Sequence, residues 1–433
     1  MRIQRSYGIE IKHYKRIFDD TLLIYREALK EVIPICNEWY DIWVGKSTKD
    51  ALTYIEMLIH NTGKNEAKYD FDKKFYKFPS YYRRSVINKA IGIVKSYRSN
   101  YSNWEETKQG KPPKLSVNHF AMPVLYNTSG YIRTGEYSAK IKIYHKNDWV
   151  WLNINLRKTD VGYITKHIRN CKESCPTLEK RNGKYYLRFL YEHKVELTNT
   201  NDIIVSVDLG VNNSATMSAM LRDGTIIGRK IIYMPKEKDR LYTTLNRIKK
   251  AQSNGNKSTP RLWAYANSYN RDISEKTAKA IIDFAVLYSA DIIVFEALNF
   301  QGKLKGSKKQ RLHLWRKQEI QNIVTNKAHA LSMRISKVCA WNTSKLAFDG
   351  SGIVQRYDNN YSICRSQKGK EYHCDLSASY NIGARYFIRD ILKTLPERER
   401  LQVEAKVPQL CTRTRCTLSD LISLNAEIKL LAV

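Results

Sequence analysis

A chain of 433 residues exceeds what one ordinary hydrophobic core holds, so two or three domains are expected. Lysine and arginine outnumber aspartate and glutamate by 74 to 42, which gives a formal net charge of +32. Chemistry on small molecules does not require such an excess, which favours nucleic acid as the partner over an anionic membrane surface. The chain has no apolar run of about 18 residues and no signal-peptide pattern at its start, so we expect a soluble intracellular protein with no membrane partner.

The eight cysteines do not indicate a disulfide framework or a zinc finger. None of them forms Cys-x-x-Cys, and the pairs Cys171/Cys175 and Cys411/Cys416 lack zinc-finger spacing. We interpret them as ordinary reduced cysteines, which behave as small apolar residues.

The first part of the chain is expected to contain one strand followed by a block of helices. Apolar and polar residues alternate within 1–14, which predicts the strand. Apolar residues then recur at helical spacing up to Pro34, which should kink or end that helix. Two more helices are expected at 48–60 and 80–104, the second with Ser80 as its N-cap.

After a helix-breaking segment at 110–113 (GKPP), the pattern changes to strands. Alternation predicts strands at 139–144, 149–156 and 185–191, and the sequence RNGK at 181–184 is a hairpin turn signal. This indicates a β-barrel-like domain into which a helical domain is inserted. We expect the barrel-like domain at 1–14 and 111–200 and the helical recognition domain at 15–110.

From residue 201 onward the pattern is that of an α/β domain. Strands are predicted at 203–209 and 227–233, and a charged helix at 237–253. A helix starting near Ser274 leads directly into a strand at 292–296. A basic loop and a further helix to about Lys337 follow. The fold class is therefore multidomain, α+β and then α/β, with the α/β domain at 201–341 and 374–433 and an insert at 342–373.

Three distant segments each provide one carboxylate. The runs 203–208 (IIVSVD) and 292–296 (IIVFE) are apolar and end on Asp208 and Glu296, while Asp375 precedes a helix of small residues. An acid at the tip of a buried strand is costly unless something binds it, and divalent metals prefer carboxylate oxygens. Phosphodiester hydrolysis by two metal ions needs such carboxylates to converge.

Each acid alone is weak evidence, because a lone aspartate at a strand end is more often a cap or loop residue. We interpret Asp202 and Asp291, at the starts of the same strands, as ordinary solvated acids. The joint occurrence of two strand-end acids, a third acid before a small-residue helix and a basic chain favours a metal-dependent nuclease.

These segments resemble a known set of motifs. The stretches 207–211 (VDLGV), 295–299 (FEALN) and 375–382 (DLSASYNI) are similar to the three split RuvC motifs of transposon-encoded TnpB nucleases and of compact type V-F CRISPR effectors. More loosely, 78–84 and 110–113 are similar to family features. The resemblance implies an RNase H-like RuvC domain, a wedge-like role for the β-barrel domain, and prokaryotic cytoplasmic localisation in antiviral defence.

The resemblance also implies the site and its cofactors. Asp208, Glu296 and Asp375 would be the catalytic ligands of two Mg²⁺ ions, with Mn²⁺ as an alternative. The family carries a four-cysteine zinc site between its second and third motifs, but here the first cysteine pair is absent and Cys364 and Cys374 lie far apart. We therefore expect no zinc in the insert, whose place a short hairpin held by apolar contacts and glycine turns would take.

Aromatic and basic residues interleave between 75 and 104, which is typical of nucleic-acid binding. A helix with an aromatic core face and a solvated basic face is the alternative, and the net charge favours binding. A second basic cluster follows Glu296. The predicted contacts are Tyr82, Arg83, Arg84, Lys303, Lys305, Lys308, Lys309, Arg311 and Arg356.

By this resemblance the protein is an RNA-guided, Mg²⁺-dependent DNA endonuclease that binds guide RNA and double- and single-stranded target DNA. Type V-F members are expected to act as homodimers on one guide RNA. The alternatives are a TnpB nuclease of a transposon, or a nuclease-dead regulator on the same fold. A structural RNA-binding protein of ribosomal type fits the charge but not the acids.

Overall fold

The computed structural model describes residues 1–12, 16–116, 121–168, 171–256, 258–297, 316–357, 360–412 and 414–431. The chain divides into two compact units, which we describe separately. The N-terminal unit is Arg2–Lys194, and the C-terminal unit is Val195–Val433 together with Met1. None of the helices within the described ranges is long and apolar enough to cross a lipid bilayer.

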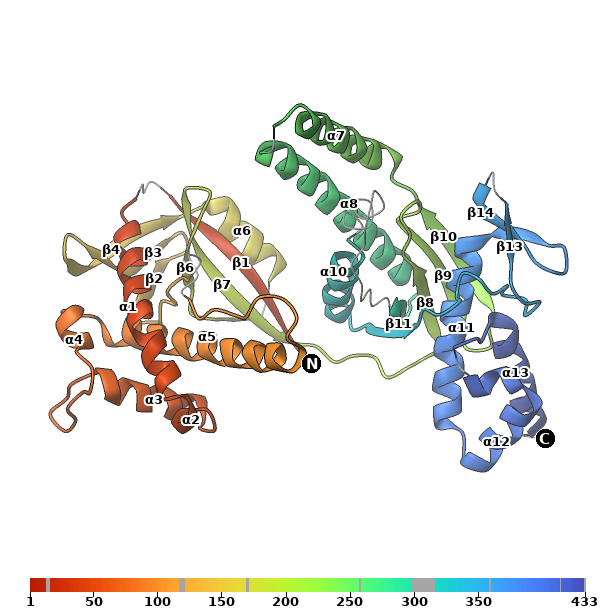
Figure 1. The fold of residues 1–433 in the computed structure, drawn as a ribbon, viewed down its shortest axis with the longest axis horizontal. Coiled ribbons are helices and arrows are strands. Elements are labelled where there is room, and N and C mark those ends of the chain that lie inside the picture. Colours follow the sequence, from red (N-terminus) through yellow and green to blue (C-terminus); the bar gives the residue numbers. More distant parts are fainter. Residues whose placement is uncertain are drawn as a thin grey trace. The chain divides into compact units, whose positions relative to one another are not determined.

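The N-terminal unit contains a seven-stranded antiparallel sheet in the order β2-β3-β4-β1-β7-β5, with β6 paired to β7 (Figure 1). Its strands are β1 (Arg2–Lys12), β2 (Tyr131–Gly135), β3 (Ser138–His145), β4 (Asp148–Leu156), β5 (Lys172–Glu173), β6 (Thr177–Arg181) and β7 (Lys184–Lys194). The segment 124–127 connects the first residue of β6 to the first residue of β2 through two isolated β-bridges, Val124↔Thr177 and Asn127↔Tyr131. The sheet is therefore barrel-like.

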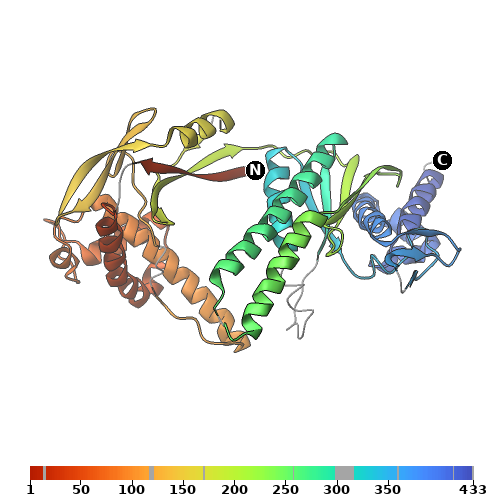
Figure 2. The same cartoon turned by 90° about the horizontal axis from the view of Figure 1, so that it is seen from above.

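Six helices accompany this sheet: α1 (Asp19–Glu38), α2 (Tyr40–Trp43), α3 (Thr48–Ile59), α4 (Phe71–Lys74), α5 (Ser80–Thr107) and α6 (Lys158–His167). Helices and strands share one hydrophobic core, in which Leu29 of α1 and Ile87 of α5 join Ile141 and Leu187 of the sheet. Figure 2 shows the red-to-orange helices on one side of the strands. The predicted helical and barrel-like regions thus form a single packed unit.

The structure excludes one of the two effects expected of Pro34, and the N-cap prediction for α5 is wrong. Pro34 does not end α1, which continues to Glu38 because Ile33, Ile35 and Cys36 beside it are buried in the core. Ser80 is the first helical residue rather than the N-cap, a position that Pro79 occupies with φ −63°. The hairpin turn before β7 is confirmed: Asn182 and Gly183 have positive φ, and Arg181 pairs with Lys184.

The C-terminal unit is built on a five-stranded sheet in the order β10-β9-β8-β11-β12. Strands β8, β9 and β10 are antiparallel neighbours, whereas β11 runs parallel to both β8 and β12. The strands are β8 (Ile203–Asp208), β9 (Ala215–Leu221), β10 (Ile226–Ile232), β11 (Ile292–Ala297) and β12 (Arg334–Cys339).

Helices cover both faces of this sheet, with α8 and α10 on one side and α11 on the other (Figure 1). Because side chains alternate along a strand, Val205 and Val207 pack toward α8, while Ile204 packs toward α11. Burial on both faces explains why these strands are continuous apolar runs. The helices are α7 (Pro235–Ser253), α8 (Pro260–Leu287), α10 (Lys317–Ala330), α11 (Cys374–Thr394), α12 (Glu397–Lys406) and α13 (Leu418–Leu431), with a 3-10 turn at Pro408–Thr412.

Between β12 and α11 lies the insert, a three-stranded antiparallel sheet of β13 (Gln355–Tyr357), β14 (Asn360–Arg365) and β15 (Glu371–His373). Ala347, Val354, Cys364 and Cys374 form its small core, and Gly350, Gly352 and Gly369 have positive φ. Apolar contacts and glycine turns therefore hold this segment, as predicted.

The boundaries of the three predicted strands in the C-terminal unit match the prediction closely, but three other assignments fail. The helix expected to reach Lys337 ends at Ala330, and Arg334–Cys339 is strand β12 instead. Strand β9 was not predicted, and α8 begins at Pro260 rather than near Ser274.

Candidate active site

The fold brings the three predicted carboxylates to one end of the C-terminal sheet. Val207 of β8 pairs with Phe295 of β11, so the residues that follow them, Asp208 and Glu296, stand side by side. Strand alternation places both acids on the face that α11 covers, because Ile204 and Val294 on that face pack into the core beneath α11. Asp375 is the second residue of α11.

The Asp208 carboxylate is close enough to the other two acids to be repelled by them. Burial raises its pKa well above the usual range, and the negative charges of Glu296 and Asp375 raise it further. Arg356 of the insert acts in the opposite direction. The segments 203–208, 292–297 and 374–394 thus meet at one electrostatically coupled site.

Glu296 is buried, with 8% of its surface exposed. Burial raises its pKa, while a hydrogen bond from the Thr343 hydroxyl and the positive charges of Arg385 and Lys317 partly offset this. The backbone oxygen of Glu296 accepts a hydrogen bond from Gln321 Nε2 at 3.3 Å. Residues of α10, α11 and the β12–insert connection therefore fix the position of this side chain.

Asp375 is held by groups that the sequence analysis did not identify. Asn213 Nδ2 donates a hydrogen bond to Asp375 Oδ2 at 2.8 Å, and the Asp375 backbone N–H donates to His373 Nδ1 at 3.2 Å. Asn213 is buried in the turn after β8, five positions beyond Asp208. Its position shortly after the strand that ends on Asp208 was the one signal in the sequence that could have indicated this role. A single asparagine in a turn is weak evidence, because asparagine is common in turns.

Arg385 of α11 holds together the backbone segments near these acids. Its guanidinium donates to the backbone oxygens of Cys416, Cys339 and Trp341 at 2.8 to 3.0 Å. Its Nη2 atom is buried without a hydrogen-bond partner among the described residues. This side chain ties the end of β12 to the segment before α13 and contributes positive charge beside Glu296.

The donor set fits a hard divalent cation, since it consists of carboxylate oxygens at a partly buried end of the sheet, where the pKa values of Asp208 and Glu296 are raised. As the side chains lie, no three His, Cys, Asp or Glu residues within the described ranges are arranged to hold a metal ion. A cation would therefore have to draw the carboxylates together.

The Aq_aa04 family matches residues 5–145, which is less than half of the chain. No curated protein matches. Among solved structures, a cryo-EM structure of a Cas12f1–sgRNA–target DNA complex matches with a TM-score of 0.54 and 13% identity, over 84% of this chain and 82% of that one.

The chain has a Cas12f1-like fold. A mini-RNA-guided endonuclease, CRISPR-Cas_phi3, gives a TM-score of 0.49 at 10% identity over 88% of this chain and 92% of that one. A CRISPR-Cas12f ternary complex gives 0.34 at 14% identity, over 85% and 81%. The predicted resemblance to compact type V effectors is confirmed at the level of the fold.

The residues predicted to contact nucleic acid in this Cas12f1-like chain differ in their exposure to solvent. Tyr82 is buried and its hydroxyl donates to the Lys142 backbone oxygen at 2.6 Å. Arg83 is also buried and pairs with Glu56 at 3.2 Å, so burial removes both side chains from the surface that nucleic acid can reach. Arg84 is half exposed and pairs with the same glutamate.

The other predicted contacts lie in the C-terminal unit. Arg356 is exposed on β13, where its Nη2 donates to the Ser344 backbone oxygen at 2.9 Å and its charge reaches Asp208. Its charge therefore acts on the acidic site, and its contact with nucleic acid stays a prediction. The second basic cluster, Lys303, Lys305, Lys308, Lys309 and Arg311, lies outside the described residues.

The two remaining interpretations concern acids and cysteines near the site. Asp202 is exposed, but Asp291 is not an ordinary solvated acid: its carboxylate accepts from the backbone N–H groups of Asp202 and Ile203 at 3.0 and 3.2 Å and from Thr200. Burial raises its pKa, yet these hydrogen bonds outweigh burial and lower the pKa overall. Asp291 thus ties the start of β11 to the start of β8.

Cys364 and Cys374 meet in the core of the insert, where hydrogen bonding between the two thiols and burial raise the pKa of Cys364. A pair of cysteines is half of a four-ligand zinc site. The absence of zinc stays a prediction.

Proposed function

We propose that the protein is an RNA-guided DNA endonuclease with a metal-dependent RuvC site at Asp208, Glu296 and Asp375. One observation carries this proposal: the negative charges of Glu296 and Asp375 both act on Asp208. The three acids come from segments that are far apart in the sequence. The Cas12f1-like fold supports it, because the matched Cas12f1 is a complex with guide RNA and target DNA.

The C-terminal sheet, with its antiparallel β8–β9–β10 portion and parallel β11 and β12, is proposed to be the RNase H-like RuvC domain. Its acids lie at the ends of adjacent strands and at the start of the helix above them. That placement is what a site for two divalent ions needs, since the ligands must converge from separate elements.

In the proposed mechanism the chain's own residues position the reacting groups. Two Mg²⁺ ions, when bound, supply an activated water and stabilise the charge that develops on the phosphate. Glu296 is oriented by Thr343, and Asp375 by Asn213. Arg356 lies where a cation can contact the scissile strand's phosphate.

The partners are part of the same proposal. Guide RNA would supply sequence recognition by base pairing, and the basic chain would hold the heteroduplex through its backbone. Two copies of the chain on one guide RNA are proposed, because one chain of this length is small for enclosing a guide–target duplex.

The test is DNA cleavage by the protein purified with its copurifying RNA. A target that matches the guide segment should be cut in Mg²⁺ and left intact in EDTA, and a target of scrambled sequence should survive in both. Binding of the matched target without any cleavage would contradict the enzyme and favour a nuclease-dead regulator. A CRISPR array or a transposase beside the gene separates the type V-F role from the TnpB role.

A further inference from the structure

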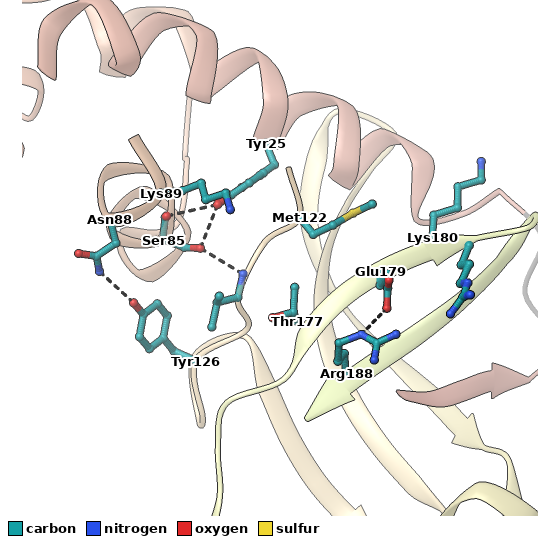
Figure 3. Close-up of a pocket in the computed structure, with 12 residues that line it drawn as sticks. Tyr25, Ser85, Asn88, Lys89, Met122, Tyr126, Thr177, Glu179, Lys180 and Arg188 are labelled. Atoms are coloured by element: carbon teal, nitrogen blue, oxygen red, sulfur yellow. Dashed lines mark hydrogen bonds and ion pairs between the residues drawn. The ribbon is translucent and has the colours of Figure 1, made fainter. Parts of the chain in front are cut away.

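The N-terminal unit contains a pocket of about 590 Å³ that is far in the chain from the acidic site and has no part in the mechanism above. It lies between helices α1 and α5, the segment 121–126 and strands β6 and β7 (Figure 3). Its volume is in the range of small-molecule sites and exceeds what a few waters need.

One end of the pocket is a hydrogen-bonded polar and aromatic surface. Tyr25 Oη donates to the Ser85 backbone oxygen at 3.2 Å, and the Ser85 hydroxyl accepts from the Val124 backbone N–H at 3.1 Å. Asn88 Nδ2 donates to Tyr126 Oη at 3.2 Å, which fixes the Tyr126 ring at the pocket wall. This end is therefore preorganised.

The Tyr126 ring is part of a wider aromatic surface. Tyr81, which is 41% exposed, lies with its ring centroid 5.6 Å from that of Tyr126. The Arg84 guanidinium stands 5.7 Å above the Tyr81 ring. The two rings are tilted by 49° rather than stacked on each other. Exposed aromatic rings with an adjacent guanidinium are suited to the face of a nucleobase.

The other end of the pocket is cationic. Lys180 pairs with Asp19 at 2.6 Å, and Arg188 pairs with Glu179 at 2.6 Å, so these two cations are partly neutralised. Arg181 also lines the pocket, whereas Lys89 lines it from α5 beside Ser85 and Asn88, at the polar and aromatic end (Figure 3). Both are exposed and form no ion pair with any residue that the structure describes. Figure 3 shows Lys180 and Arg188 across the pocket from Asn88 and Tyr126.

We propose that this pocket binds one unpaired nucleotide of a nucleic-acid strand, with the base against Tyr126 at the end that Lys89 also lines, and the phosphate against the cationic end that includes Arg181. Charge selects an anion, because Lys180 and Arg188 are paired with carboxylates while Arg181 and Lys89 add two positive charges that no described carboxylate offsets. The size and the aromatic wall select a base in addition to a phosphate. The inference rests on one part of the proposed function, namely that the protein binds a nucleic-acid strand to which this nucleotide belongs. It does not depend on cleavage.

The test compares two double variants that remove the same charge from the same unit. Lys89→Ala/Arg181→Ala empties the pocket of its two unpaired cations, whereas Lys166→Ala/Lys172→Ala removes two exposed lysines elsewhere on the unit. Fluorescence anisotropy of short oligo(U) and oligo(dT) is measured in EDTA at physiological salt. Because neither cleavage nor metal is involved, the result is independent of whether the acidic site is a nuclease.

The proposal predicts that the pocket variant loses about tenfold in affinity and the control variant much less. Oligonucleotides that carry 5-iodouracil should photocrosslink to Tyr126 in the wild type, and the crosslink should weaken in the pocket variant. The strand type with the larger loss, RNA or DNA, identifies the source of the nucleotide. Equal losses in the two variants, or crosslinks confined to residues outside the pocket, would overturn the proposal.

Discussion

Asp208 combines burial with two neighbours of the same charge, an arrangement that costs free energy when no cation is near. Burial makes the larger contribution to its raised pKa, Glu296 and Asp375 add to it, and Arg356 offsets only part. A hard divalent cation would offset both the burial of Asp208 and its repulsion by the other two acids, since the cation supplies positive charge and takes the place of the lost water. Under the proposed function, the free energy that this residue costs the metal-free fold would be recovered on metal binding.

The first prediction concerns the stability of the metal-free protein. A carboxyl group with a raised folded-state pKa binds its proton more tightly when folded, so its contribution to stability falls as pH rises through that pKa. Asp208→Asn should therefore stabilise the metal-free C-terminal unit by about 1 kcal/mol at neutral pH. The advantage should shrink as the pH falls and wild-type Asp208 takes up its proton. Calorimetric unfolding in EDTA across this pH range measures it.

The matched control is Asp202→Asn, at the exposed start of the same strand. It should leave unfolding unchanged at every pH. If Asp208→Asn lowered the free energy of unfolding, or if Asp202→Asn raised it as much as Asp208→Asn does, the charged Asp208 side chain would not be destabilising the metal-free protein. Added Mg²⁺ should stabilise the wild type and have little effect on Asp208→Asn.

At the scale of elements, α11 places Asp375 because it lies directly on the sheet. A Cβ atom on Gly383 would stand 2.9 Å from Met220 Cε and 3.2 Å from Ser206 Oγ. Ser377, Ala378 and Ala384 are buried on the same helix. Small residues thus let α11 approach β8 and β9 closely, which brings its N-terminus to the acids.

We predict that Gly383→Val destabilises the C-terminal unit by about 2 kcal/mol, because the branched side chain must displace Met220 or shift the helix. Cleavage should fall with it, since Asp375 moves with α11. Calorimetry and the cleavage assay measure the two effects.

Gly92 of α5 gives the contrasting case. It is exposed, and a Cβ there would meet nothing within 4 Å. Gly92→Ala should stabilise the N-terminal unit by about 1 kcal/mol through helix propensity. If Gly383→Val were as harmless as Gly92→Ala, close packing of α11 would not be what sets the position of Asp375.

The elements also show how far the sequence alone leads. Strands β8 and β11 were predictable because burial on both faces leaves continuous apolar runs that end on an acid. Strand β12 was not, since Arg334–Cys339 carries two cations in six residues and becomes a strand only by pairing with β11. Tyr82 and Arg83 show the same limit: interleaved aromatic and basic residues do not reveal which of them face the core.

The site was predictable to a similar degree. Asp208, Glu296 and Asp375 were identifiable because two of them end continuous apolar runs and the third precedes a helix of small residues. Asn213 and Thr343 were not, because their roles depend on contacts with residues 162 and 47 positions away. The same holds for Asp291, whose hydrogen bonds join strand starts 89 positions apart.

At the scale of the whole molecule, two units with separate cores carry a net charge of +32. Such a chain is expected to bind nucleic acid with strong salt dependence. The proposed homodimer predicts a complex with two chains per RNA. Light scattering on the purified protein–RNA complex measures this mass, and a mass of one chain per RNA at all concentrations would contradict the dimer.

The central claim is that three distant acids form one metal site in a guided nuclease. Cleavage of a guide-matched target in Mg²⁺, compared between wild type, Asp202→Asn and Asp208→Asn, tests it most directly. All three complexes should bind the target, and Asp202→Asn should cut it like the wild type. Asp208→Asn should cut it about a thousandfold more slowly. Cleavage by Asp208→Asn at the wild-type rate would contradict the account.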